Sequence, residues 1–215
     1  SNIALATSVL LSLIASRVEA CTDPTDPAQF GALQIAQIKS SAGRAHFYDA
    51  ACDAGAKGLE ACRRKAYVQP GDVVLIGDIH DTTACATFVD KKGRATSGII
   101  KASTVEPVRG ADQSTRRAFV GRWVREEAEI SVTAKGPALA FKGEATYGSK
   151  DPQRVARGAV NSGNIDFTAD PASNRLSVGL SGPDGATAVA KDKVAATDCQ
   201  LDMIVLGPYL VVKDN

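Results

Sequence analysis

Asp78 and His80 are the residues whose types and spacing most directly suggest chemistry in this 215-residue chain. They follow an apolar run, residues 73–76, in the segment Gly-Asp-Ile-His. A carboxylate and an imidazole two residues apart at the end of a strand can ligate a divalent metal. A two-metal site needs further ligands of this kind from separate loops, so the rest of the chain tests the idea.

The segment resembles the opening of the metallophosphoesterase family, which continues with Gly-Asp, then Gly-Asn-His, then two more histidines. Here His46 is the only other histidine, no second Gly-Asp follows, and the later Gly163-Asn164 is not followed by histidine. We therefore expect no metal and no cofactor. A strand that ends at Ile79 and turns through residues 80–82 accounts for the segment instead.

The first 20 residues predict an export signal. Residues 3–15 are almost entirely apolar, but as a helix they would rise only ~20 Å, short of the ~30 Å hydrocarbon core of a bilayer. Val18 and Ala20 supply small residues at positions minus three and minus one before Cys21. We expect cleavage of a signal peptide over residues 1–20 and a periplasmic or secreted protein, with lipid attachment to Cys21 as an alternative.

Export would place the five cysteines in an oxidising compartment, where disulfides are the default. Cys52 and Cys62 flank a short polar loop and are predicted to form a local bridge, and Cys21 with Cys85 is the second predicted pair. Cys199 is left over, either as a buried thiol on a core strand or with a partner beyond the end of the sequence. The absence of Cys-x-x-Cys spacing argues against a zinc knuckle or a thioredoxin-type redox centre.

The chain after residue 20 has the pattern of an all-β protein. Apolar residues alternate with polar ones over residues 129–134, 174–180 and 199–205, and segments rich in Gly, Pro and Asp separate such runs. Only residues 58–66 could hold a helical turn or two. These features predict strands packed as a sandwich or barrel.

A polar segment without alternation, residues 106–117, predicts a boundary between two small domains. The expected arrangement is a small N-terminal barrel domain over 21–108, a linker over 109–117, and a C-terminal antiparallel β-barrel or sandwich over 118–215.

Residues 41–108 combine a first strand carrying Tyr48, a Tyr-x-x-x-Gly-Asp segment that starts at Tyr67, and later strands separated by a polar turn and a Gly-containing turn. This order of features resembles the bacterial Src-homology-3 domain, a small barrel of exported and cell-wall proteins. The sequence departs from that pattern at two tryptophan positions, which fall near Cys85 and at Ile99.

The resemblance implies recognition of a peptide, or of the peptidoglycan stem peptide, in a groove. It implies Tyr48 and Tyr67 as stacking walls, with Asp49 and His80 as polar contacts at the rim. The alternative is that each tyrosine is a core residue whose hydroxyl bonds to backbone. In this interpretation residues 77–78 bend a β-hairpin whose tip exposes His80 to solvent.

The second half opens with Phe119, Gly121 and Trp123, which resembles the Gly-x-Trp start of lipocalin-like barrels. We expect Trp123 to be a core aromatic with its indole N–H bonded to backbone. A cavity behind Trp123 that carries a small apolar ligand is the alternative.

Composition and motifs argue against several other functions. The net charge is +1 with few aromatic residues, so a nucleic-acid surface is not expected. Glu126 and Glu127 lie in a charged run typical of a solvated strand edge rather than of a glycosidase pair. The Gly-x-Ser-x-Gly elbow, the phosphate loop and the dinucleotide fingerprint are missing, so we expect a protein without catalytic activity.

Two kinds of envelope partner remain open. The first is the cell-wall peptide or peptidoglycan, and the second is a hydrolase such as lysozyme, for which the chain would be an inhibitor or immunity protein. A concave aromatic groove would favour a wall ligand, whereas a protruding loop with an exposed apolar or acidic tip would favour a protein target.

Overall fold

The structure is a computed structural model that describes residues 30–49, 58–80, 82–108, 115–182, 187–195 and 198–214. Over these residues the chain is built of antiparallel β-strands, with one short α-helix, α2 (Pro152–Ala156), and several 3₁₀ turns. The predicted all-β fold class is confirmed. The predicted signal peptide lies outside the described residues.

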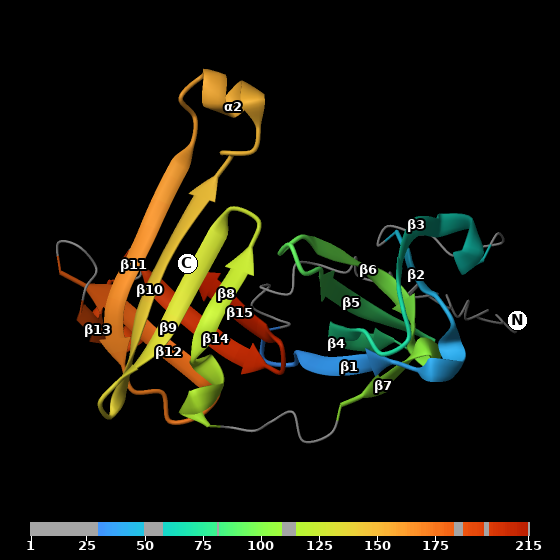
Figure 1. Cartoon of the computed structure of the whole chain (residues 1–215), viewed down its shortest axis with the longest axis horizontal. Helices are drawn as coiled ribbons and strands as arrows, with labels where there is room; N and C mark the ends of the chain where they lie inside the picture. The colour runs from blue at the N-terminus through green and yellow to red at the C-terminus, as the bar shows by residue number, and fades with distance from the viewer. Residues whose placement is uncertain are drawn as a thin grey trace, which may run out of the picture.

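Seven strands form one sheet, here called the N-terminal sheet, in the order β3–β2–β6–β5–β4–β1–β7 (Figure 1). Its strands are β1 (Gln34–Ile38), β2 (Ala45–Tyr48), β3 (Arg63–Val68), β4 (Val73–His80), β5 (Thr83–Val89), β6 (Ala95–Lys101) and β7 (Val105–Pro107). Alternate residues point to one face and bury a core that includes Ile38, Phe47, Val74 and Ile100. This sheet and its core account for the region that the sequence assigns to the SH3-like domain.

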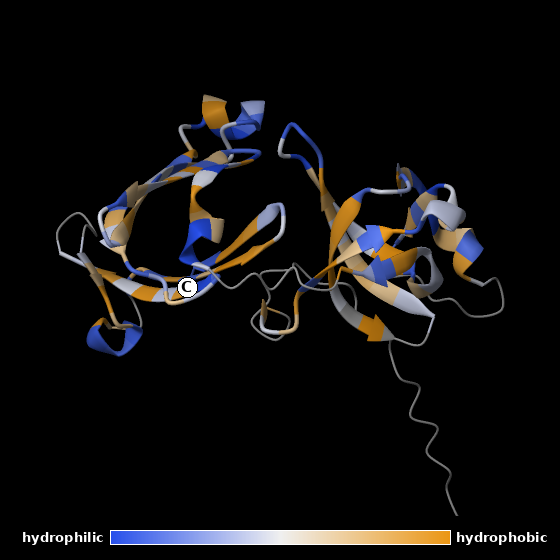
Figure 2. Cartoon of the chain, turned by 60° about the horizontal axis from the view of Figure 1, so that its bottom comes forward, coloured by the Kyte–Doolittle hydropathy of each residue, from blue (hydrophilic) through white to orange (hydrophobic). Residues whose placement is uncertain are grey.

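The second half of the chain forms two four-stranded sheets that face each other, here called the C-terminal sandwich (Figure 2). The first sheet, in the order β11–β10–β9–β8, consists of β8 (Gly121–Arg125), β9 (Ala128–Lys135), β10 (Ala138–Tyr147) and β11 (Asn161–Ala169). The second, in the order β13–β12–β14–β15, consists of β12 (Arg175–Ser181), β13 (Thr187–Val189), β14 (Gln200–Leu206) and β15 (Tyr209–Asp214).

Three phenylalanines anchor the core between these two sheets. Phe141 stacks on Phe167 with ring centroids 4.9 Å apart and meets Phe119 edge-on at 5.7 Å. Trp123 packs against the same core, and its indole N–H donates to the carbonyl of Phe119 over 2.8 Å. The prediction of Trp123 as a core aromatic bonded to backbone is confirmed.

A third apolar core, here called the junction core, joins the N-terminal sheet to the sandwich. It consists of Leu33, Ile35 and Leu75 from the first half and Ile204, Leu206, Tyr209 and Val211 from the second. The Tyr209 hydroxyl also donates to the carbonyl of Val73. Because β14 buries Met203 in the sandwich core and Ile204 in the junction core, the second half of this strand is apolar on both faces.

Two tight turns make a second contact between the halves. The β5–β6 turn brings Gly93 against the β8–β9 turn, where the amide of Glu126 donates to the carbonyl of Gly93 over 3.1 Å. Gly93 has a φ of +79°, and a Cβ atom there would lie 2.7 Å from the Cα of Arg125. Glycine is needed for both reasons, the left-handed backbone and the close approach.

The Gly-Asp-Ile-His segment ends the first strand of a β-hairpin, as predicted. β4 continues through residues 77–78 to His80, which pairs with Thr83 of β5. The register between the two strands shifts between Ile76 and Ile79, which marks a β-bulge. Residues 77–78 therefore lie at a bulge within the strand, which bends the strand locally, rather than at the tip of the hairpin.

One of two short helices was predicted from the sequence and the other was not. Residues 58–66 hold one helical turn, η2 (Leu59–Cys62), as predicted, and the basic residues that follow begin β3. Helix α2 was not predicted, although Asp151 caps it by accepting bonds from the amides of Gln153 and Arg154, with proline at its first turn. Most of the predicted linker lies outside the described residues, and its end forms η4 (Arg116–Phe119).

The cysteines fall into two groups. Cys62 and Cys85 each take part in a disulfide. Their predicted partners, Cys52 and Cys21, lie outside the described residues, so the predicted pairing stays a prediction. Cys199 is a free thiol, exposed just before β14. The alternative of a buried thiol on a core strand is wrong, because the strand begins one residue later.

Candidate functional site

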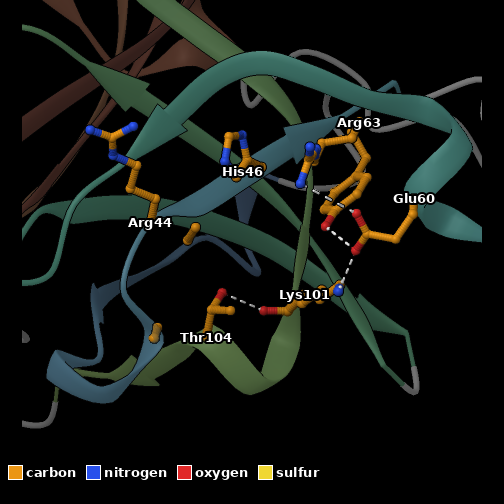
Figure 3. A pocket seen from close by; sticks show the side chains of 9 residues that line it. Arg44, His46, Glu60, Arg63, Lys101 and Thr104 are labelled. Atoms are coloured by element: carbon orange, nitrogen blue, oxygen red, sulfur yellow. Dashed lines mark hydrogen bonds and ion pairs between the residues drawn. The ribbon is translucent and has the colours of Figure 1, made fainter.

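The surface of the N-terminal sheet is hollowed where β2 separates from β6. Within the described chain these strands pair in register at Tyr48 and Ile99, and beyond that pair His46 and Lys101 line a pocket of about 220 Å³. Figure 3 shows the pocket from close by. Its lining residues are Ala42, Arg44, Ala45, His46, Tyr48, Glu60, Arg63, Lys101 and Thr104.

Backbone packing fixes the place where the strands part. Gly98 of β6 has no side chain to hold β2 away, and a Cβ atom there would lie 2.9 Å from the carbonyl oxygen of Tyr48. If the antiparallel ladder continued, His46 would stand opposite Lys101. Both residues instead face the pocket, together with Thr104 from η3 (Ala102–Thr104).

Glu60 is held at the edge of the pocket by two donors. Its Oε1 atom accepts a hydrogen bond from the Tyr48 hydroxyl over 2.9 Å and another from Lys101 Nζ over 2.6 Å. The Lys101 ammonium also lies 5.8 Å from the centre of the Tyr48 ring. Arg63 approaches the other carboxylate oxygen at 3.8 Å (Figure 3). Among the described lining residues Glu60 is the one carboxylate, and it is held by these three side chains.

These bonds fix the charges of the three groups at neutral pH. The hydrogen bond from Lys101, and then that from Tyr48, lower the pKa of Glu60. The same bond to Glu60 raises the pKa of Lys101. Burial, and then the bond to Glu60, raise the pKa of Tyr48. Glu60 is thus ionised, Lys101 is protonated and Tyr48 is neutral.

Further cationic and imidazole groups lie along β2. The Arg44 guanidinium covers the ring of Tyr67 at 4.5 Å from its centre. His46 places Nδ1 at 3.2 Å from the carbonyl oxygen of Arg64, an acceptor, so this nitrogen carries a proton. Arg44, Arg63 and Lys101 together outnumber the one carboxylate among the lining residues.

The structure brings the two predicted tyrosines to the same region but in different roles. Tyr48 is buried and lines the pocket, with its hydroxyl bonded to Glu60 rather than to backbone. Tyr67 is 37% exposed, and its ring centre lies 5.6 Å from that of His46. Tyr67 therefore lies beside the pocket without lining it. His46 of β2 is the cross-strand partner of Tyr67 of β3.

The two predicted polar residues lie outside the lining. Asp49 follows β2 and approaches Arg64 at 3.7 Å. His80 is the last residue of β4, and two strands, β5 and β6, separate β4 from β2 in the sheet. The residues that sequence reasoning missed are Arg44, His46, Glu60, Arg63 and Lys101, which come from three separate segments.

The pocket is equipped to bind an anionic group. Cationic side chains around a pre-ordered carboxylate and a tyrosine offer charge-assisted hydrogen bonds. Across the described residues, no three His, Cys, Asp or Glu side chains gather as metal ligands. Among the described residues the free thiol is that of Cys199, which does not line the pocket, and partial desolvation raises its pKa and so reduces its thiolate fraction.

Comparisons with known proteins add no relative: no family model, no curated protein and no solved structure matches the chain. In the part of the chain that the structure describes, no helix has the length and apolar character needed to cross a membrane. Inference about function therefore starts from the pocket and from the surface of the molecule.

Proposed function

We propose that this protein is a non-catalytic binding protein of the bacterial envelope, and that the pocket between β2 and β6 takes a carboxylate of a peptide such as the peptidoglycan stem peptide. The observation that carries the proposal is the charge of the described lining residues, which include three cationic side chains and one carboxylate. Since Glu60 already accepts bonds from Tyr48 and Lys101, the remaining positive charge is available to a ligand.

The size of the pocket favours a small terminal group. Its volume of about 220 Å³ is below the ~300–1,000 Å³ of sites that enclose a drug-sized ligand. One amino-acid residue with its carboxylate fits this space better than a sugar chain does. Capture of a C-terminal carboxylate is a recurring mode of peptide recognition.

Neighbouring residues supply a surface for the rest of a peptide. Tyr67 is exposed beside Arg44 and offers an aromatic wall next to the pocket. The envelope location rests on the predicted export signal and on the resemblance to cell-wall Src-homology-3 domains. Stem peptides of peptidoglycan carry free carboxylates, so the chemistry of ligand and pocket agree.

The test is sedimentation of the purified protein with purified peptidoglycan. The wild-type chain is expected to pellet, and Arg63→Ala with Lys101→Ala is expected to weaken binding at least tenfold, about 1.4 kcal/mol. The matched control is Lys65→Ala with Lys92→Ala, because both lysines are exposed on the same sheet and neither lines the pocket. A wild-type chain that stays in the supernatant would overturn the proposal.

Glu60→Gln gives a sharper test because it acts in the opposite direction. The substitution keeps the shape and the bond to Tyr48 but removes the charge that neutralises Lys101. We expect binding of an acidic stem peptide to tighten several-fold. Unchanged or weaker binding would show that Glu60 only supports the fold of the pocket.

A further inference from the structure

The β10–β11 hairpin extends beyond the sheet to which it belongs. Its ladder continues to Tyr147 and Asn161, whereas the ladder between β9 and β10 ends at Ala145. Helix α2 connects the two strands at the far end, and Figure 1 shows it standing clear of the rest of the sandwich. Residues 146–161 are called the α2 tip below.

Hydrogen bonds hold the α2 tip in one conformation. The carbonyl of Glu127 accepts a bond from the amide of Thr146 over 2.7 Å. Its carboxylate accepts bonds from the Ser149 hydroxyl over 2.7 Å and from the Lys150 amide over 3.0 Å. Glu127 itself has a φ of +63°, a conformation that is unfavourable for a residue other than glycine. Such strain persists only where the surrounding contacts fix it.

The exposed groups of the α2 tip are aromatic, apolar and cationic. Tyr147 is 63% exposed and Val155 is 52% exposed. The Arg154 guanidinium covers Tyr147 at 4.3 Å from the ring centre, and its Nη1 atom is buried without a hydrogen-bond partner. Lys150 and Arg157 are exposed on the same tip. Tyrosine and arginine dominate the energetics of protein interfaces.

The α2 tip carries three cationic side chains, those of Lys150, Arg154 and Arg157, and one carboxylate, that of Asp151. The Asp151 carboxylate caps α2, and that of Glu127 binds Ser149 and Lys150. These hydrogen bonds do not remove the charge of the two carboxylates, but the three cations still outnumber them. The excess of positive charge favours an acidic partner.

A protein cleft suits this surface better than a lipid bilayer does. Helix α2 has five residues, of which only Val155 is a large exposed hydrophobic, so it lacks the apolar face of a membrane-surface helix. A rigid convex element loses little entropy when it enters a concave site. Glycosidases place two carboxylates across a cleft, which gives an acidic concave surface of the required kind.

We propose that the α2 tip enters the acidic cleft of a cell-wall glycosidase and blocks it. This role is independent of the pocket in the N-terminal sheet. Tyr147 and Val155 would pack against the cleft walls, and Lys150 and Arg157 would face its carboxylates. The chain would then both bind the wall and protect it from hydrolysis.

The test is inhibition of peptidoglycan lysis by two probes, egg-white lysozyme and a bacterial muramidase. The wild-type chain is expected to inhibit at least one of them. Lys150→Glu with Arg157→Glu is expected to raise the half-inhibitory concentration at least tenfold. The matched control is Lys135→Glu with Arg175→Glu, which makes the same change of charge at exposed positions of the sandwich outside the tip.

Each other outcome overturns the inference. No inhibition of either enzyme excludes the proposed partner, and an equal loss in the tip and control variants would reduce the effect to net charge. Binding to phosphatidylglycerol vesicles that disappears in the tip variant, without inhibition of either enzyme, would assign the tip to a membrane. Circular dichroism of both variants confirms that each has folded. Since peptidoglycan sedimentation uses the pocket alone, failure here leaves that separate proposal standing.

Discussion

The N-terminal sheet and the C-terminal sandwich are both antiparallel and both enclose apolar cores, yet their surfaces have opposite shapes. In the first, β2 pairs in register with β6 at Tyr48 and Ile99 and then diverges to leave a pocket. In the second, the β10–β11 ladder outruns its neighbour β9 and leaves a projecting tip. Both surfaces arise where the lengths of adjacent ladders do not match.

The two surfaces also handle charge differently. In the pocket one carboxylate, Glu60, is outnumbered by the cations around it. At the α2 tip the carboxylates of Asp151 and Glu127 are used to fix the backbone. In both places cationic side chains outnumber carboxylates, which leaves an excess of positive charge for a partner. A net charge of +1 for the whole chain conceals this local imbalance.

The largest expected effect comes from the junction core, which decides whether the two halves behave as separate units. Ile204 is 0% exposed there, and Ile204→Ala is expected to cost about 2–5 kcal/mol. Hydrogen exchange should accelerate in β1 and β14 together. Faster exchange in β14 with unchanged protection in β1 would show that the halves are independent.

The second contact between the halves is expected to contribute less. Gly93→Ala places a Cβ atom against the backbone of Arg125 and forces a left-handed conformation on alanine, with an expected cost of about 1–3 kcal/mol. Urea denaturation followed by circular dichroism measures the loss. Gly136→Ala is the control, because it has a φ of +59° but no neighbour within 4 Å of the added atom. Equal losses would mean that the contact with Arg125 adds nothing.

Tyr209→Phe tests one hydrogen bond of the junction core. Loss of the bond to the Val73 carbonyl is expected to cost about 0.5–1.5 kcal/mol. Burial raises the pKa of Tyr209 to about 12 from its ordinary 10.0. The pKa of Tyr209 is higher in the folded than in the unfolded chain, so the neutral hydroxyl stabilises the fold fully below about pH 10. This stabilisation is lost as the pH rises towards about 12.

The phenylalanine variant lacks this titration. The difference in unfolding free energy between wild type and Tyr209→Phe should therefore shrink between about pH 8 and about pH 11. A constant difference over that range would place the Tyr209 hydroxyl in water in the folded protein.

The smallest effect is expected at an exposed ion pair of the sandwich. Arg122 donates two hydrogen bonds, of 2.5 and 2.6 Å, to the Glu129 carboxylate. The arginine is exposed, so Arg122→Ala is expected to cost only about 0.2–1 kcal/mol. Thermal unfolding measures the change. A larger loss of stability would show that the exposed pair of Arg122 with Glu129 holds β8 to β9.

Much of the fold could be predicted from the sequence because strand patterning is local. Alternation placed Leu176, Val178 and Leu180 on one face of β12, and all three are buried. The bulge at residues 77–78 could not be distinguished from a turn, because the difference depends on the register with β5. Burial of both faces of β14 depends likewise on which sheet packs against it.

The candidate site could be predicted only in part. Tyr48 was found because an aromatic residue in the first strand is visible in the sequence. Glu60 and Lys101 were missed because they come together only when η2 and the end of β6 meet in space. The basic run at residues 63–65 was the one local signal for the charge of the pocket.

The central claim is recognition of a carboxylate by the pocket between β2 and β6, and calorimetric titration with a stem tripeptide tests it most directly. The tripeptide is compared in two forms, with a free C-terminal carboxylate and with an amide. The account predicts that the free acid binds at least tenfold more tightly, about 1.4 kcal/mol, and that this preference disappears in Arg63→Ala with Lys101→Ala. Equal binding of acid and amide by the wild-type chain would contradict it.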